Sequence, residues 1–273
     1  MTVGTLLLGI ALVVYLGSVA ACIAEMTGAI RPASRYSLIT AFVGLLIQGA
    51  GIVAVGIGQH RIPFANLFES LALSSWIMML LYLVNARKHR IEALGALAGL
   101  IAAWMIGAGL ALPKTLNPIL LKYMSSPWSA IHITASLFSY AAFLLSAGAA
   151  VGYIIQEHML KTKRINAVQK YLPSLDELDH TAYTMATFGF VMLTLGMVCG
   201  SLWAATAWGS YWNWDGKETW SLVTWLVYAA YLHTRMLRGW RGKWSNRLLL
   251  AGLACVIITY IGVTFIATSR HNL

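Results

Sequence analysis

The chain has 273 residues, of which 59% are hydrophobic and only 10% are charged. Soluble domains carry about 25% charged residues, so this composition cannot cover a water-exposed surface and predicts a membrane protein. The net charge is +10, but the placement of the cations argues against nucleic-acid binding as its explanation. The three cysteines lie far apart in apolar runs and form no CxxC pair, which argues against a zinc site or thiol exchange.

Eight apolar stretches are long enough to cross the ~30 Å hydrocarbon core of a bilayer. They lie near residues 3–24, 37–58, 68–85, 92–112, 129–155, 181–202, 219–236 and 247–268. Backbone polar groups in lipid must be satisfied within their own segment, so each stretch should form a helix. The sequence therefore predicts an all-α, polytopic membrane protein with about eight transmembrane helices, forming one domain over residues 1–273.

The basic residues follow the alternation of these spans. The loops after the first, third, fifth and seventh spans hold 14 of the 19: Arg31, Arg35, Arg87, Lys88, Arg90, Lys161, Lys163, Arg164, Lys170, Arg235, Arg238, Arg241, Lys243 and Arg247. Because cytoplasmic loops are enriched in Lys and Arg, we expect these four loops in the cytoplasm and both termini outside it. The charge thus reports topology, not nucleic-acid binding, and the chain is expected to lie in a lipid bilayer.

Tryptophan is concentrated in one outer segment. Six of the eleven tryptophans fall between Trp203 and Trp225, and we expect residues 203–218 to form an extracytoplasmic tryptophan-rich loop. An ordinary interfacial belt of aromatic residues explains two or three of them at a helix end. The alternative is a flat apolar platform for a porphyrin, on which Lys217 pairs with a propionate. Asp215 and Glu218 are then better placed to cap the following helix.

The run WAATAWGSYWNWDGKETW, from Trp203 to Trp220, closely resembles the WWD signature of the CcsA/ResC family of system II cytochrome c biogenesis. Its continuation to Arg235, the PFANLFES stretch from Pro63 and the stretch around His132 are also similar. One departure is Gly216, where that family usually has proline. The resemblance implies a factor that moves haem across the membrane and presents it outside, with Trp208, Trp212, Trp214 and Asp215 in the haem-binding segment.

Histidines are the natural axial ligands for such a haem. His132 at the start of the fifth span and His271 after the eighth fall on the outer side, where each taken alone is an ordinary interfacial residue. The resemblance implies that His132 and His271 are the two iron ligands of external haem. The sequence around His271 departs from the family's usual Gly-Leu-His-Ser-Tyr.

His233 lies in the inner half of the seventh span, where an ionisable residue suggests function, although an interfacial histidine explains it equally well. The resemblance implies that His233 binds haem entering from the cytoplasm, with the second ligand on a partner. On the outer side, His60 is a candidate for shaping the external site and Glu69 for capping the third span. His89, His158 and His180 are assigned no role.

The resemblance also implies the setting of the reaction. The cofactor is haem b, carried and then presented to apocytochrome c, whose CxxCH motif supplies a histidine and two thiols. A separate ResB/CcsB-type membrane partner and a separate thiol-reducing protein are expected. The chain would act within a holocytochrome c synthase complex, mainly by positioning, and no catalytic residue is assigned. The expected location is a bacterial plasma membrane rather than a chloroplast thylakoid membrane.

Three other classes compete with this interpretation. A system I relative of the CcmC type shares the WWD signature, but eight spans and the long match through Arg235 favour system II. A b-type electron-transfer subunit needs facing histidine pairs within the spans, and the sequence offers none. A transporter of an unrelated hydrophobic solute is the third class, and haem absorbance in the purified protein would distinguish it from the haem-binding classes.

Overall fold

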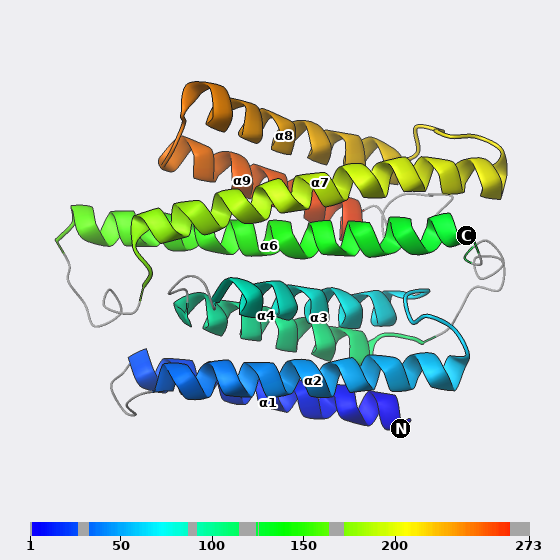
Figure 1. Ribbon diagram of the computed structural model, residues 1–273, viewed down its shortest axis with the longest axis horizontal. Helices are drawn as coiled ribbons and strands as arrows, with labels where there is room; N and C mark the ends of the chain where they lie inside the picture. Colours follow the sequence, from blue (N-terminus) through cyan, green and yellow to red (C-terminus); the bar gives the residue numbers. More distant parts are fainter. Residues whose placement is uncertain are drawn as a thin grey trace. The chain divides into compact units, whose positions relative to one another are not determined.

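The computed structural model describes residues 2–26, 33–86, 92–114, 124, 126–163 and 172–262, and within these ranges it contains helices and no strand (Figure 1). The helices are α1 (Val3–Met26), α2 (Ala33–Gln59), α3 (Leu67–Ala86), α4 (Glu92–Ala111), α6 (Pro127–Lys161), α7 (Leu175–Trp208), α8 (Gly216–Arg238) and α9 (Lys243–Ile257). A short π-helix, η2 (Ile258–Gly262), continues α9. The first seven predicted spans each overlap one of these helices, and the eighth, 247–268, is described as far as Gly262 by α9 and η2, which confirms the all-α polytopic fold.

Six of these helices, α1 to α4, α6 and α7, are long and apolar enough to cross a membrane. The two described helices that fall short are α8, whose tyrosines, tryptophans and terminal cations lower its hydropathy, and α9, which has 15 residues before η2 begins. Helices α6 and α7 have 35 and 34 residues, so each is about 50 Å long and extends well beyond a ~30 Å hydrocarbon core.

The described chain forms two compact units, and α6 and α7 each contribute to both. The first unit comprises residues 1–115 and 151–181, with α1 packed on α2 and α4, and α3 packed on α4 and α2. Its interior contains the fully buried Gln48, which accepts a hydrogen bond from Tyr15 Oη (2.7 Å) and donates to Ser75 Oγ (2.6 Å). A glutamine is tolerated within an apolar helix because its polar atoms are satisfied by neighbouring helices.

The second unit comprises residues 116–150 and 182–273, and its described part contains the start of α6, most of α7, and α8, α9 and η2. Aromatic contacts join these helices: Phe143 of α6 stacks on Tyr228 of α8, with ring centroids 3.5 Å apart. The indole of Trp225 donates to Thr194 Oγ1 of α7 at 3.0 Å. This unit carries the tryptophan-rich segment and the histidines His132 and His233.

The tryptophan-rich segment differs from its predicted form. Helix α7 continues to Trp208 and α8 begins at Gly216, so only residues 209–215 are irregular, where a loop over 203–218 was expected. The extension has a local cause, because three of the four residues between Trp203 and Trp208 are alanine, the best helix former.

Candidate functional site

His132 lies in the second turn of α6 and is held by α7. Its Nδ1 lies 2.7 Å from the backbone oxygen of Gly196. A carbonyl oxygen only accepts hydrogen bonds, so Nδ1 carries the proton and donates it. In a neutral ring the lone pair then lies on Nε2, which is the atom that can bind a metal. In metal-binding histidines a hydrogen bond from the other ring nitrogen, like the one from Nδ1 here, fixes the orientation of the ring.

Two glycines, four residues apart on α7, make room for this contact. A Cβ atom added at Gly200 would lie 2.6 Å from His132 Nδ1, closer than real Cβ contacts. A Cβ at Gly196 would lie 2.8 Å from Ser136 Oγ of α6. Small residues at this spacing let membrane helices approach closely. The Gly196–Gly200 pair therefore sets how near His132 can come to α7.

Aromatic rings continue from this histidine along α7. The Trp203 ring, with 3% of its residue surface exposed, lies 5.8 Å from the His132 ring at an interplanar angle of 32°. Trp208 follows at 5.5 Å from Trp203. The predicted platform thus begins on the last turns of a helix, and Trp203, absent from the predicted site residues, connects His132 to it.

The irregular segment presents two further tryptophans. Trp212 and Trp214 meet edge to face, with centroids 5.8 Å apart. Trp214 is 69% exposed and has a φ of 56°, a left-handed conformation that is costly for a bulky side chain. Tyr211 beside them is 64% exposed. Strain of this kind is concentrated at functional sites.

A capping box fixes the junction between this segment and α8. The carboxylate of Asp215 accepts from the Glu218 backbone N–H at 2.8 Å, and the Glu218 side chain reaches back to the Asp215 backbone. Glu218 also accepts from the Asn213 N–H at 2.6 Å. The predicted cap is therefore confirmed, while direct contact of Asp215 with haem stays a prediction.

Lys217 lies in the first turn of α8, before the predicted span. Burial lowers the pKa of Lys217, and the negative charge of Asp215 opposes that shift. An anionic ligand would further favour the charged ammonium. Pairing of Lys217 with a propionate stays a prediction.

His233 is separate from this cluster. It lies five residues before the end of α8, at the opposite end from Asp215, and its side chain is exposed. Exposed apolar residues share its side of the helix at helical spacing, Leu226 seven residues before it and Leu237 four after it. His271 lies outside the described residues, so the predicted pair of outer ligands rests on the sequence.

In the first unit, the side chain that caps α3 is Asn66, where Glu69 was the predicted candidate. The buried carboxylate of Glu69 accepts two hydrogen bonds from the Arg61 guanidinium, at 2.6 and 2.8 Å, and one from the Ala65 N–H. Asn66 caps the Glu69 N–H at 2.8 Å. Arg61 was not predicted as the partner, although it is a cation on the same predicted side of the membrane. His60 lies exposed at the preceding turn with a φ of 53°.

Comparison with known proteins gives consistent results. The model of the family described as cytochrome C assembly protein matches residues 64–271. A cytochrome c biogenesis protein CcsA of Prochlorococcus marinus (strain NATL1A) is 34% identical over 238 residues, covering 77% of this chain and 76% of the relative. Another CcsA, from Synechococcus sp. (strain CC9605), is 33% identical over 270 residues, with 89% of each covered.

A solved structure shows the same fold at lower identity. The cytochrome c heme lyase CcmF superposes with a TM-score of 0.72 at 19% identity. The alignment covers 95% of this chain but only 46% of CcmF, so the likeness concerns the fold alone. The family model and the sequence relatives lead to one assignment: the chain belongs to the cytochrome c assembly protein family, as a relative of the CcsA cytochrome c biogenesis proteins.

Proposed function

We propose that this protein holds haem b between His132 and His271 against the tryptophan-rich segment and presents it for covalent attachment to apocytochrome c. A haem-handling role in cytochrome c biogenesis comes with the family. The ligands, the face on which haem rests and the direction of transport are the content of the proposal. The proposal also puts both termini and the tryptophan-rich segment on the outer side of the membrane, as the distribution of basic residues favours.

The geometry of His132 carries the proposal. Its Nδ1 hydrogen bond to Gly196 leaves Nε2 for iron, and the neighbouring Trp203 ring starts an aromatic surface of the kind a porphyrin face packs against. Trp208, Trp212 and Trp214 continue that surface with partly or fully exposed rings. His271 supplies the second ligand from the segment after η2.

His233 binds haem on its way from the cytoplasmic side. Its exposed position beside apolar residues such as Leu237 suits a ligand that faces another membrane protein. A ResB/CcsB-type partner covers this face and contributes the second ligand. Haem that enters here is then passed to the outer site.

At the outer site the chain's own task is positioning. Bound haem supplies two vinyl groups, to which the two thiols of the apocytochrome CxxCH motif add, and the motif's histidine replaces one of the ligands. The capped junction at Asp215 and the packed His132 hold the surface still while thiols and vinyls meet. The three cysteines lie far apart in the sequence and form no CxxC pair, so the proposal assigns reduction of the thiols to a separate protein.

Visible spectra of the purified chain test the proposal. The wild type, prepared with its partner and haem, is expected to show a six-coordinate b-type spectrum in the oxidised and reduced states. His132→Ala and His271→Ala should each weaken haem binding at the outer site about hundredfold or more, the upper end of what metal sites lose when a supporting residue is removed. His158→Ala, an exposed histidine without an assigned role, is the matched control. A bis-histidine spectrum that survives both ligand substitutions in a chain that also carries His233→Ala, so that the inner site is removed, would refute the assignment.

A further inference from the structure

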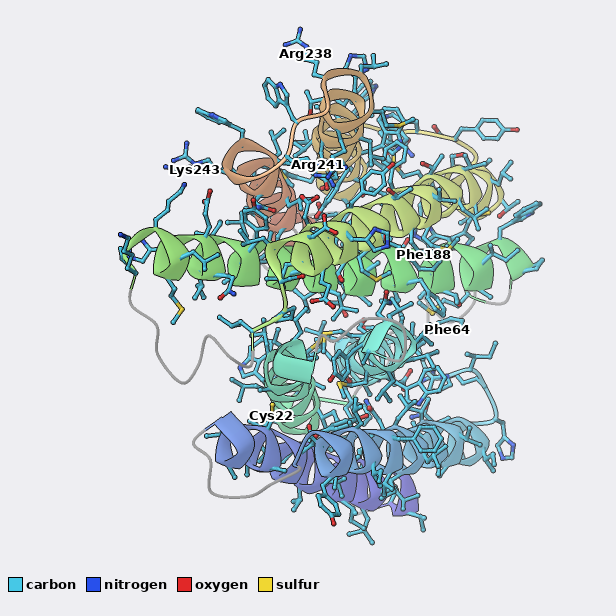
Figure 2. The ribbon with its side chains drawn as sticks, turned by 60° about the vertical axis from the view of Figure 1, so that its left-hand side comes forward. Cys22, Phe64, Phe188, Arg238, Arg241 and Lys243 are labelled. Carbon is cyan, nitrogen blue, oxygen red and sulfur yellow. The ribbon has the colours of Figure 1, made fainter. Side chains whose placement is uncertain are left out.

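The turn between α8 and α9 carries a dense group of cations. We call residues 235–247 the basic turn; its cations are Arg235, Arg238, Arg241, Lys243 and Arg247. Figure 2 shows Arg238, Arg241 and Lys243 around the turn that joins the two helices. Arg238, Arg241, Lys243 and Arg247 all have exposed side chains.

The acidic residues of the second unit lie far from this charge. The sequence contains no Asp or Glu from Thr219 to Leu273, and the acids of the second unit are Asp215 and Glu218. Both cap the far end of α8, which has 23 residues and is about 33 Å long. That separation is several times the ~8 Å Debye length at physiological salt, so the acids do not neutralise the turn. At the end of α6, by contrast, Lys161 pairs with Glu157 at 2.8 Å.

Helix stability accounts for only part of the cluster. Arg235 and Arg238 lie in the last turn of α8, where cations complement the helix dipole. Arg235 is also held over the Tyr183 ring, 5.1 Å from its centroid. Lys243, however, begins α9, where the dipole disfavours a cation, and Arg241 lies in the turn itself. Among the described residues neither the helix dipole nor a contact accounts for these two cations, and a bound anion would.

The basic turn also has the side chains of a membrane interface. Arg247 lies 4.8 Å above the ring of Trp244, which is 65% exposed, and Arg238 lies 5.9 Å from the Trp240 ring. Met236 and Leu237 beside them are 71% and 72% exposed. Tryptophan favours the headgroup region of a bilayer, and exposed apolar side chains suit the acyl chains beneath it. Phosphate contacts and apolar contacts are thus available side by side.

We propose that the basic turn is a binding site for an anionic phospholipid, whose headgroup phosphate is held by Arg241 and Lys243 while Trp244 contacts its glycerol and acyl region. The site lies in the leaflet that faces the turn. It is independent of haem and of the proposed outer site. No side chain among the described residues caps the start of α9 at Gly242. The backbone N–H groups there can also donate hydrogen bonds to an anion, as the two cations do.

Lipid binding by the full chain tests this site. The purified protein is titrated with phosphatidylglycerol or with phosphatidylcholine of identical acyl chains, and bound lipid is counted by native mass spectrometry. The wild type should retain phosphatidylglycerol in preference to phosphatidylcholine. Arg241→Gln with Lys243→Gln should weaken phosphatidylglycerol binding about thirtyfold, the effect of removing two cations near an anionic surface.

Two further variants make the result specific. Lys161→Gln with Lys163→Gln removes two cations from the end of α6 and should keep the preference, since Lys161 already pairs with Glu157. Arg241→Lys with Lys243→Arg preserves both charges and should also keep it, which guards against misfolding as the cause. Equal retention of both lipids by the wild type would overturn the proposal, as would an equal loss in the α6 variant. Binding of a glutamate-rich peptide through Arg241 and Lys243 without any lipid preference would replace the lipid with an acidic protein.

Discussion

Two histidines on the same unit are held in opposite ways. His132 has one nitrogen fixed by the Gly196 carbonyl and a tryptophan beside its ring, whereas His233 lies exposed at the end of α8. Within the described residues no hydrogen bond fixes the His233 ring. A preorganised ligand can bind metal with little reordering, while an exposed one gains its geometry from a second molecule. The difference suggests an outer site largely prepared by this chain and an inner site completed by a partner.

The largest effect is expected from removing His233, which tests whether the two histidines differ in their need for a partner. His233→Ala should leave haem binding by the isolated chain unchanged, because the proposed inner site takes its second ligand from the partner. In the complex with the ResB/CcsB-type partner it should weaken haem binding at the inner site about hundredfold or more, the upper end for lost support at a metal site, and leave the haem of the outer site in place. Haem absorbance per chain, measured with and without the partner, checks both parts.

His132→Ala provides the contrast, because its effect should be present with or without the partner. If His233→Ala already abolished haem binding by the isolated chain, the inner site would be preformed and the comparison would be wrong.

A smaller effect is expected from filling the space beside His132. Gly200→Ala places a Cβ 2.6 Å from Nδ1, so the ring must shift and its hydrogen bond to Gly196 must weaken. Loss of such a supporting hydrogen bond should reduce haem affinity at the outer site about tenfold and change its reduction potential. Haem titration and a potentiometric titration measure the two effects.

Gly17→Ala is the matched control, since an added Cβ there meets nothing within 4 Å. An affinity and potential that stay at wild-type values in Gly200→Ala would show that the Gly196–Gly200 pair does not position His132.

The features that the sequence predicted well are local. Helices follow from apolar runs that must satisfy their own backbone, and the Asp215–Glu218 cap joins residues three apart. The contact of His132 with Gly196 joins residues 64 apart, and no pattern around either residue specifies that they meet. The spacing of Gly196 and Gly200 on α7 indicates that another helix can approach closely there. It does not indicate that the side chain beside them is His132.

The limits of the helices were less predictable than their existence. Hydropathy placed the end of the sixth span at residue 202, although α7 runs on through alanines to Trp208. Helix formation there depends on propensity rather than on lipid exposure. The pairing of Arg61 with Glu69 likewise depends on a tight turn after α2, whose geometry no charge pattern reveals.

Asp215 allows a sharper test of what belongs to the outer site. Asp215→Ala removes the N-cap of α8 and should destabilise the protein by about 1 kcal/mol. Asn caps helices as well as Asp does but carries no charge, so Asp215→Asn should retain the stability. Thermal unfolding and haem titration of both variants separate capping from ligand contact.

If Asp215 only caps, Asp215→Asn binds haem like the wild type. A loss of haem affinity in Asp215→Asn with unchanged thermal stability would instead assign the carboxylate to the haem site.

The smallest expected effect is a gain in stability when Gly216 is replaced by proline. This residue is the first of α8 after its N-cap and has no positive φ, so proline should fit there. An α-helix leaves the backbone N–H at this position without an intrahelical partner, so proline loses no helix hydrogen bond there. Proline also reduces the conformational entropy of the unfolded chain, which stabilises the folded state. Gly216→Pro should therefore stabilise the protein by about 0.5 kcal/mol, seen as a small rise in the unfolding temperature.

Ala229→Pro, in the middle of the same helix, is the control and should destabilise the protein by about 3 kcal/mol because it removes an internal hydrogen bond. A clear loss of stability in Gly216→Pro would mean that the junction depends on glycine, and that the tryptophan-rich segment is held in a conformation that proline forbids.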